Sequence, residues 1–258
     1  KVSVLDLYRY ADTGVNWRVV EGYGALVARY ARGLDIRFDC PVIRIDHGAL
    51  PIRVETARGM VTAQAVIVTL PASLIALEAV TFTPALPNKT EAAAGLPLGH
   101  DDKLFLSLEH ADEFEPDSRL FGRTDRTGTG AYHMRPFGRP LIECYFGGAL
   151  AQELERGGAQ AFFEFARGEL VNLLGSDFAK RIAPVALHSW GADPFARGAY
   201  SYARPGSADC RAALAAPVDH RIFFAGEACS PDDFSTAHGA FLTGMAAAEA
   251  VLKTHAPA

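Results

Sequence analysis

The sequence is poor in cysteine and has no arrangement that would use it. Its four cysteines, Cys40, Cys144, Cys210 and Cys229, are scattered over 258 residues without a C-x-x-C pair. This spacing argues against a disulfide framework and against a zinc site, and it indicates reduced, mostly buried thiols. We therefore expect a cytoplasmic protein.

A long hydrophobic run is also missing. The most apolar stretch, residues 65–80, is shorter than the roughly 20 residues that cross a bilayer, and Pro71 interrupts it. There is no excess of positive charge, because 25 lysines and arginines are outnumbered by 30 aspartates and glutamates, and the net charge is −5. We thus expect neither a membrane nor a nucleic acid as partner.

Several catalytic motifs are absent as well. The sequence contains no H-E-x-x-H, no G-x-S-x-G, no phosphate-binding G-x-x-x-x-G-K-[ST] and no calcium loop. Metallohydrolase and serine-hydrolase functions therefore have no support, and no metal site is expected. What is present is the composition of a globular protein with a sizeable core, with 49% hydrophobic and 21% charged residues.

Hydrophobic periodicity and turn residues predict an α/β fold of two layered domains. Helices are expected over residues 25–32, ended by Gly33, over 159–174, ended by Gly175, and over 236–253. The apolar face of the last helix would consist of Phe241, Met245, Ala248 and Leu252. The expected strands are residues 18–20, 35–38, 42–45, 52–56, 60–63, 65–70, 104–108, 141–146, 185–190 and 221–225.

A glycine turn near the start imitates a dinucleotide-binding fingerprint. Gly22 and Gly24 follow a predicted strand and precede a helix, and Asp46 ends a later strand. Val27, however, occupies the third small position, where its branched side chain would hold the helix away from the strand. Nucleotide binding at this turn and a helix start without a ligand are both open at this point.

The C-terminal segment carries the strongest pattern. A buried strand ends at Gly226, which lets a ligand approach the backbone, and Glu227 follows at the carboxyl edge, where α/β proteins bind ligands. The next helix opens with Ser235, Thr236 and small residues, so its amides and positive dipole end suit an anion or an electron-rich carbonyl. The alternative is an ordinary capped amphipathic helix that packs Phe241 into the core.

These residues carry a family resemblance. FFAGEACSPDDFSTAHGAFLTG (residues 223–244) resembles the C-terminal FAD-binding motif of the flavin-containing amine oxidase superfamily, which includes monoamine oxidases, polyamine oxidases, L-amino-acid oxidases and histone lysine demethylases. Other segments are similar to those of the family in the same order: residues 20–46, 66–75 with 82–89, PLGHDDK (97–103) and 190–206.

The resemblance implies a partial two-domain flavoprotein. An incomplete, Rossmann-like FAD-binding domain (residues 17–72 and 199–258) would be interleaved with a sheet-plus-helix substrate domain (1–16 and 73–198). The implied activity is oxidation of a C–N bond of an amine or amino acid, with hydride transfer to the flavin and O₂ as acceptor.

The resemblance also implies roles for single residues. Lys103 would be catalytic and hold a water at flavin N5, where partial burial would lower the pKa of its ammonium group; an exposed strand lysine is the alternative. The residues implied in FAD binding are Val42, Trp190, Glu227, Thr236 and Ala237. Tyr200 and Phe241 would form the aromatic walls of the substrate site, which suit a near-cationic amine.

Two departures from the family pattern bear on function. Ala199 stands where monoamine oxidases carry the cysteine that binds flavin covalently, so any FAD should be noncovalent. The family's N-terminal G-x-G-x-x-G unit is missing, so we expect a fragment that binds FAD weakly or not at all when alone. A desaturase or dehydrogenase that does not use O₂, a nicotinamide-dependent dehydrogenase and a non-catalytic scaffold stay open, as does a homo-oligomer.

Overall fold

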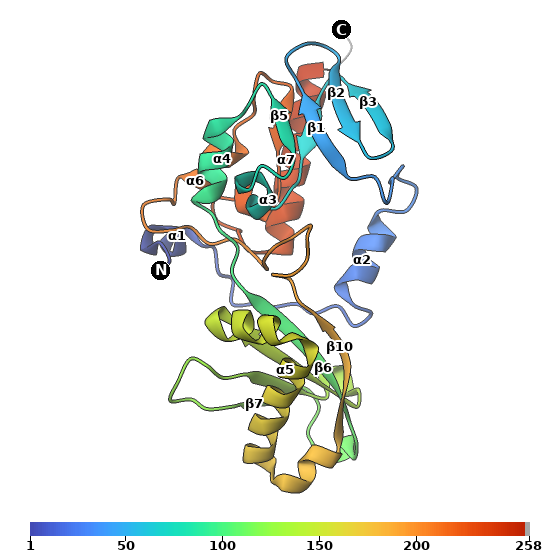
Figure 1. Cartoon of the computed structure of the whole chain (residues 1–258), viewed down its shortest axis with the longest axis vertical. Helices are drawn as coiled ribbons and strands as arrows, with labels where there is room; N and C mark the ends of the chain where they lie inside the picture. The colour runs from blue at the N-terminus through green and yellow to red at the C-terminus, as the bar shows by residue number, and fades with distance from the viewer. Residues whose placement is uncertain (256–258) are drawn as a thin grey trace. The chain divides into compact units, whose positions relative to one another are not determined.

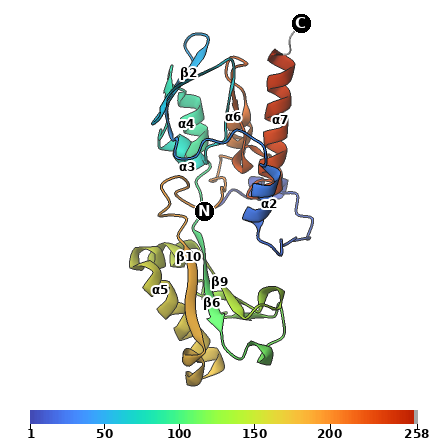
Figure 2. The ribbon, with the colours of Figure 1, turned by 90° about the vertical axis from the view of Figure 1, so that its right-hand side faces the viewer.

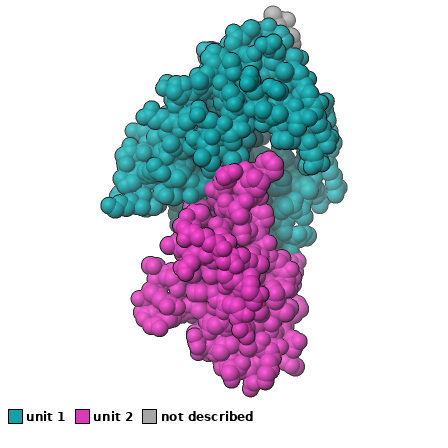
Figure 3. Space-filling model, in the orientation of Figure 1, with its two compact units in different colours: residues 1–98, 200–258 teal, residues 99–199 magenta. Residues whose placement is uncertain are grey.

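The chain divides into two compact units, which Figure 3 distinguishes by colour. The computed structural model describes residues 1–255, so the last three residues of the predicted 199–258 segment lie outside the described residues. Unit 1 consists of residues 1–98 and 200–258, and unit 2 of residues 99–199. The division differs from the predicted boundaries, because residues 1–16 and 73–98 fold into unit 1. The assignment of FAD binding and substrate binding to separate domains stays a prediction.

Within residues 1–255, unit 1 has two small sheets and six α-helices, most of which are labelled in Figure 1. Its strands are β1 (Val42–Asp46), β2 (Ile52–Thr56), β3 (Gly59–Ala63), β4 (Val66–Val68), β5 (Thr81–Thr83) and β11 (Ile222–Phe224). Its helices are α1 (Val4–Arg9), α2 (Tyr23–Tyr30), α3 (Ala72–Ala76), α4 (Pro87–Ala94), α6 (Cys210–Ala215) and α7 (Ala237–His255), with a 3₁₀ turn, η4, at Glu227–Cys229.

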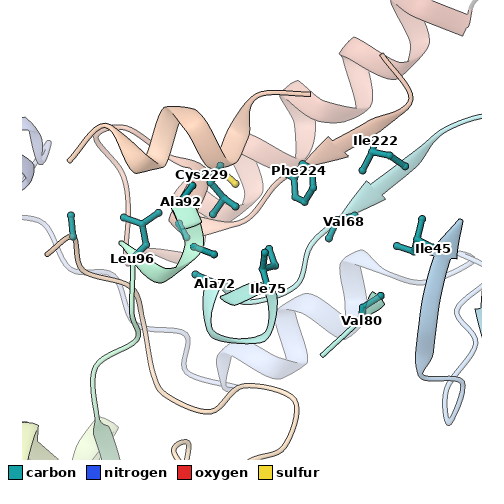
Figure 4. Close-up of a cluster of buried hydrophobic side chains, with 14 of the residues drawn as sticks. Ile45, Val68, Ala72, Ile75, Val80, Ala92, Leu96, Ile222, Phe224 and Cys229 are labelled. Atoms are coloured by element: carbon teal, nitrogen blue, oxygen red, sulfur yellow. The ribbon is translucent and has the colours of Figure 1, made fainter. Parts of the chain in front are cut away.

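The two sheets of unit 1 share one core. One sheet has the order β3-β2-β1-β5, in which β1 pairs antiparallel with β2 and parallel with β5. In the other, β11 pairs parallel with β4, so that Phe224 lies beside Val68. Figure 4 shows Ile45, Val68, Ile75 and Phe224 of this core, all buried. The strand expected over residues 65–70 from its continuous apolar run is the shorter β4, in which Val68 is 5% exposed but Ile67 is 37% exposed. Because successive side chains point to opposite faces, the strand is covered on one face, and the expectation of a strand buried on both faces is wrong.

Unit 2 is an antiparallel sheet packed against one long helix. The strand order is β10 (Ile182–His188), β6 (Asp101–Leu108), β9 (Leu141–Gly147), β8 (Ala131–Met134) and β7 (Arg119–Phe121). Helix α5 (Gly148–Leu174) lies on one side of β6, β9 and β10 (Figure 2), and Gly158, with φ 72° and ψ −172°, breaks it into two parts. Short 3₁₀ turns, η1 (Ala111–Glu113), η2 (Pro136–Gly138) and η3 (Ser176–Lys180), complete the unit.

Alternation along β6 separates the two faces of this sheet. Leu104, Leu106 and Leu108 are buried and share a core with Phe162 and Leu170 of α5. Residues of the opposite parity, which include Asp101 and Lys103, therefore lie on the face away from α5. The predicted helix over 159–174 corresponds to the part of α5 that follows the break, and Gly175 ends it with φ 95°.

Two predicted strands are wrong, and the predicted core face of the last helix is wrong as well. Residues 18–20 and 35–38 have irregular backbone and belong to no sheet, because apolar residues alone do not make a strand without a ladder to join. Phe241, Met245 and Leu252 of α7 are exposed by 47%, 47% and 70%. The helix instead buries Ala247 against β11.

The cysteines are free thiols. Cys144 and Cys229 are buried, and Cys40 and Cys210 are partly buried. Burial raises the pKa of the Cys229 thiol to about 12, with the neighbouring Glu227 charge adding to the effect. This thiol is therefore protonated at neutral pH and packs as a small hydrophobic side chain.

Candidate functional site

The end of β11 forms a sharp corner that leads towards α7. Gly226 adopts φ 139°, a conformation that favours glycine, and a Cβ built there would meet no atom within 4 Å. The Thr243 hydroxyl accepts a hydrogen bond from the Gly226 amide at 3.0 Å and lies 3.0 Å from the Gly226 carbonyl. The corner is thus tied to the second turn of α7 and leaves open space beside the backbone.

Glu227 binds its own chain with both carboxylate oxygens. Its Oε1 accepts from the Ser201 amide at 3.0 Å, and its Oε2 accepts from the Ser201 hydroxyl at 2.7 Å and from the Ser235 amide at 2.8 Å. The Ser235 hydroxyl closes the ring by donating to the Ser201 carbonyl at 2.7 Å. The carboxylate therefore fastens the loop after Tyr200 to the start of α7, a role that the sequence did not indicate.

A buried ion pair between Arg211 and Asp6 is hydrogen-bonded to this Ser201–Glu227–Ser235 ring through the Ser201 hydroxyl. Arg211 Nε and Nη2 donate to the two Asp6 carboxylate oxygens at 2.8 and 2.9 Å, and each side chain is 1% exposed. Arg211 Nη1 donates to the Ser201 hydroxyl at 3.0 Å, and its guanidinium lies 3.7 Å from the centroid of the Phe234 ring. Sequence reasoning missed this pair, since 205 residues separate its members.

Thr236, expected as the first residue of the helix, lies one residue before α7 and caps it. Its hydroxyl accepts from the Gly239 amide at 3.0 Å and donates to the Asp233 carbonyl at 2.6 Å. A Cβ at Gly239 would overlap the Asp233 carbonyl, so this position requires glycine. Ala237 follows as the first, exposed residue of the helix. The predicted FAD contacts of Thr236 and Ala237 stay predictions.

The other predicted residues of unit 1 lie on three separate elements. Tyr200 precedes the Ser201–Glu227 ring and is 43% exposed. Phe241, on α7, contacts the Tyr30 ring of α2 edge-to-face, with 5.7 Å between centroids. Val42 opens β1 and packs partly buried against the core. Core packing of Phe241 is therefore wrong, and the ligand contacts of all three residues stay predictions.

Lys103 lies on β6 in unit 2, on the sheet face away from α5. Its Nζ is 2.7 Å from Glu143 Oε1, and its side chain is 48% exposed whereas that of Glu143 is 9% exposed. The Tyr145 ring centroid lies 5.9 Å from the same ammonium. The lysine is thus a half-exposed cation, held in place by a buried carboxylate that the sequence analysis did not single out.

Trp190 lies near Lys103 at the same end of unit 2. The pairing of β10 with β6 places His188 opposite Lys103, and Trp190 follows two residues later. The Trp190 amide donates to Asp102 Oδ1 at 2.9 Å, and its ring contacts that of His188 at 4.2 Å. The two predicted flavin-contacting residues of unit 2 therefore come together at one end of the β6–β10 pair.

The glycine turn at Gly22–Gly24 does not have the geometry of a dinucleotide site. Gly22 caps α2 with φ 93°, but no strand precedes it, and none of the α2 residues is buried. Asp46 binds the Arg53 guanidinium at 2.5 Å and the Gly48 amide at 3.2 Å, which together lower the pKa of its carboxyl group. The turn is a helix start, and the nicotinamide alternative loses its structural basis.

Similarity to solved structures defines the class of fold. A redesigned putrescine oxidase matches with a TM-score of 0.75 and 20% identity over 92% of this chain and 54% of that structure. Cyclohexylamine oxidase from Brevibacterium oxydans matches with a TM-score of 0.63 and 21% identity over 83% and 48%. These matches confirm the predicted α/β fold.

The family follows from the sequence match. A family model described as flavin containing amine oxidoreductase matches residues 2–252, so the chain belongs to this family, and the resemblance is confirmed. Probable polyamine oxidase 4 of Arabidopsis thaliana is 31% identical over 92% of this chain and 48% of its own length. Lysine-specific histone demethylase 1 homolog 2 of Oryza sativa subsp. japonica is 29% identical over 95% and 33%. The chain spans about half the length of the polyamine oxidases that it matches. It spans about a third of the length of the histone demethylase homologue.

None of the helices formed by residues 1–255 is both long enough and apolar enough to cross a membrane.

Proposed function

We propose that the protein oxidises a C–N bond of an amine in an FAD-dependent reaction, with O₂ as the electron acceptor. The observation that carries this proposal is the Gly226–Glu227 corner at the head of α7, in a chain that belongs to a flavin-containing family. A polyamine is the substrate class suggested by the names of the relatives, and an amino acid is the second class that the resemblance allows.

The residues at the corner fit one end of FAD. The open space beside Gly226 and the capped, exposed start of α7 would receive the ribityl and isoalloxazine portions. Val42, Thr236 and Ala237 would contribute contacts, while Glu227 would act mainly by fixing the loop that carries Tyr200. With Ala199 at the position of the flavin-linking cysteine, we expect the cofactor to be noncovalent.

The remaining residues would orient substrate and charge. FAD, when bound, supplies the acceptor for the hydride equivalent that leaves the carbon next to the amine nitrogen. Tyr200 and Phe241 offer aromatic faces that attract a cationic amine. Lys103, held by Glu143, offers a fixed positive charge that would stabilise negative charge developing near it.

We further propose that residues 1–258 by themselves bind FAD weakly. Within residues 1–255 the Gly22–Gly24 turn has no strand before it, as a pyrophosphate site would need, and the apolar face of α7 is exposed. Each missing charge-assisted contact would cost about 1.5–3 kcal/mol of binding free energy. A further polypeptide segment that covers α7 and supplies those contacts would complete the site.

Replacement of Lys103 tests the proposed reaction. In the full-length protein, Lys103→Met should lower amine-dependent H₂O₂ formation roughly 10²-fold, because it removes the positive charge. Lys180→Met is a matched control, since Lys180 is 81% exposed and pairs with Asp177 on η3. Retained dye reduction without H₂O₂ formation in the unmodified protein would favour a dehydrogenase. Absence of amine-dependent turnover with either acceptor would favour a scaffold.

A further inference from the structure

Two acidic side chains hold the backbone directly after β10. The Trp190 amide donates to Asp102 Oδ1 at 2.9 Å, and the Gly191 amide donates to Glu155 Oε1 at 2.7 Å. Asp102 belongs to β6, and Glu155 belongs to the part of α5 that precedes the break. A Cβ at position 191 would overlap the Glu155 carboxylate, so a larger residue there would displace that side chain. Two successive peptide amides are thus bound by two carboxyl groups from different elements.

These two acids are buried, and the ionisable nitrogen beside them is that of a histidine, His100, rather than of a lysine or arginine. Asp102 is 0% exposed, the Glu155 side chain is 10% exposed, and Asp102 Oδ2 has no hydrogen-bond partner. Within the part of the chain that the structure describes, neither acid forms an ion pair with a lysine or arginine. Lys103, the next residue, points to the opposite sheet face and pairs with Glu143. Two buried carboxylates without a lysine or arginine partner favour the uptake of one proton.

The other titratable groups around the pair are His100 and Asp101, and neither donates a hydrogen bond to the Asp102 or Glu155 carboxylate. His100 Nδ1 lies 3.5 Å from Glu155 Oε2 but makes no hydrogen bond, and its Nε2 lies 3.4 Å from Gln152. Asp101 adds a further negative charge on β6. Burial, followed by the charges of Glu155 and Asp101, raises the pKa of Asp102 to about 6, although the Trp190 amide opposes the shift. A proton on Asp102 Oδ2 would give this atom its missing partner, the Glu155 carboxylate.

The indole of Trp190 reports on this backbone segment. It is 44% exposed, and its ring lies 4.2 Å from that of His188, whose Nε2 is 3.2 Å from Asp193 Oδ2. His188 and Asp193 are therefore the titratable groups that face Trp190 on the side away from Asp102. A shift of the Trp190 and Gly191 amides would change the contact between the indole and His188.

We propose that Asp102 and Glu155 are a proton-sharing pair that positions Trp190. With one proton between the two carboxyl groups, the pair holds both amides. When Asp102 Oδ2 releases that proton to solvent, the two negative charges repel each other and the Trp190–Gly191 segment loosens. The consequence for the flavin rests on the proposed function, in which Trp190 borders the cofactor, but the coupling itself needs no cofactor.

Tryptophan fluorescence tests the coupling directly, because Trp17 and Trp190 are the two tryptophans of the 258-residue chain. In the chain with Trp17→Phe, emission from Trp190 should change in one transition with a midpoint near pH 6. Asp102→Asn keeps an acceptor for the Trp190 amide and offers a donor to Glu155, so it should abolish the transition and hold the low-pH emission at every pH. Glu155→Gln should do the same.

His188→Asn is the control, because protonation of His188 would also change the emission of the adjacent indole. The transition should survive in this variant. Its loss in His188→Asn together with its persistence in Asp102→Asn would overturn the proposal, as would the absence of any transition in the Trp17→Phe chain. None of these outcomes depends on flavin, so they are distinct from a failure of the proposed oxidation.

Hydrogen exchange in the full-length protein gives a second measurement that needs no substitution. After correction for intrinsic rates, exchange of a peptide that covers Trp190 and Gly191 should be faster at pH 7.5 than at pH 5. Equal protection at the two values would contradict the release of the segment.

Discussion

Two buried aspartates, one in each unit, are satisfied in opposite ways. Asp6 in unit 1 is 0% exposed and binds Arg211 through both carboxylate oxygens, while one of these oxygens also accepts from the Ala203 amide. Asp102 in unit 2 is equally buried, but one of its oxygens accepts a single amide and the other has no partner. The charge of Asp6 is balanced by the Arg211 guanidinium. The charge of Asp102 has no such partner, and a proton on its Oδ2 would neutralise it.

This difference predicts opposite responses to substitution. Removal of Arg211 would leave the Asp6 carboxylate buried without a countercharge. Such a change causes one of the largest losses in the free energy of unfolding that a single substitution produces. Neutralisation of Asp102 would remove a charge that the surroundings already disfavour. Breaking the Asp6–Arg211 pair therefore destabilises unit 1, while the Asp102–Glu155 pair makes unit 2 sensitive to pH.

The largest expected effect belongs to Arg211→Met. It removes both bonds to Asp6, the bond to Ser201 and the stacking on Phe234, so we expect a loss of about 3–5 kcal/mol in the free energy of unfolding. Urea denaturation measures this loss. Asp6→Asn added to Arg211→Met should recover part of it, because the stranded charge is gone. A loss below about 1 kcal/mol would show that the pair is not the anchor of unit 1.

For Asp102→Asn we expect a smaller change, an increase in the free energy of unfolding at neutral pH. The pKa of Asp102 is raised from 3.8 to about 6 in the folded state, so the folded protein binds more protons than the unfolded chain between these values. The stabilising contribution of this group is present at low pH and is lost as pH rises from about 4 to about 6. Asp102→Asn should lack this loss. The test is the difference in unfolding free energy between the variant and the unmodified protein, which should grow in favour of the variant from pH 4.5 to pH 7.

Glu227→Gln should have the smallest of these effects on stability. The glutamine NH₂ group would face the Ser201 hydroxyl or the Ser235 amide, which are themselves donors. The lost hydrogen bond would lower the free energy of unfolding by about 1–3 kcal/mol. Glu249→Gln, an exposed position on α7, is the control. Under the proposed function, Glu227→Gln should also weaken FAD binding, because the Tyr200 loop is no longer fastened to α7. Unchanged stability would mean that the ring of hydrogen bonds does not hold this loop.

The sequence predicted those elements that depend only on residues close together in the chain. The strands β1, β2 and β3 were expected within one residue of their ends, because the alternation of each strand is contained in five residues or fewer. The start of α7 was expected at residue 236, one residue before its observed first residue, and the Thr236 cap that fixes it involves only the next three residues.

Features that depend on distant contacts could not be predicted in this way. Nothing near Asp6 indicates Arg211, and nothing near Asp102 indicates Glu155 as its neighbour on α5. The apolar stripe on α7 was found, but periodicity does not tell which face of a helix the rest of the unit covers. Residues 18–20 failed as a strand for the same reason, since a strand exists only with its ladder.

The visible spectrum of the full-length protein tests the central claim most directly. We expect one noncovalent FAD per chain, and a flavin band that bleaches when a polyamine is added without oxygen and returns when air is admitted. Residues 1–258 purified alone should show little or no such band. A full-length protein without flavin, or with a flavin that no amine or amino acid reduces, would contradict the account.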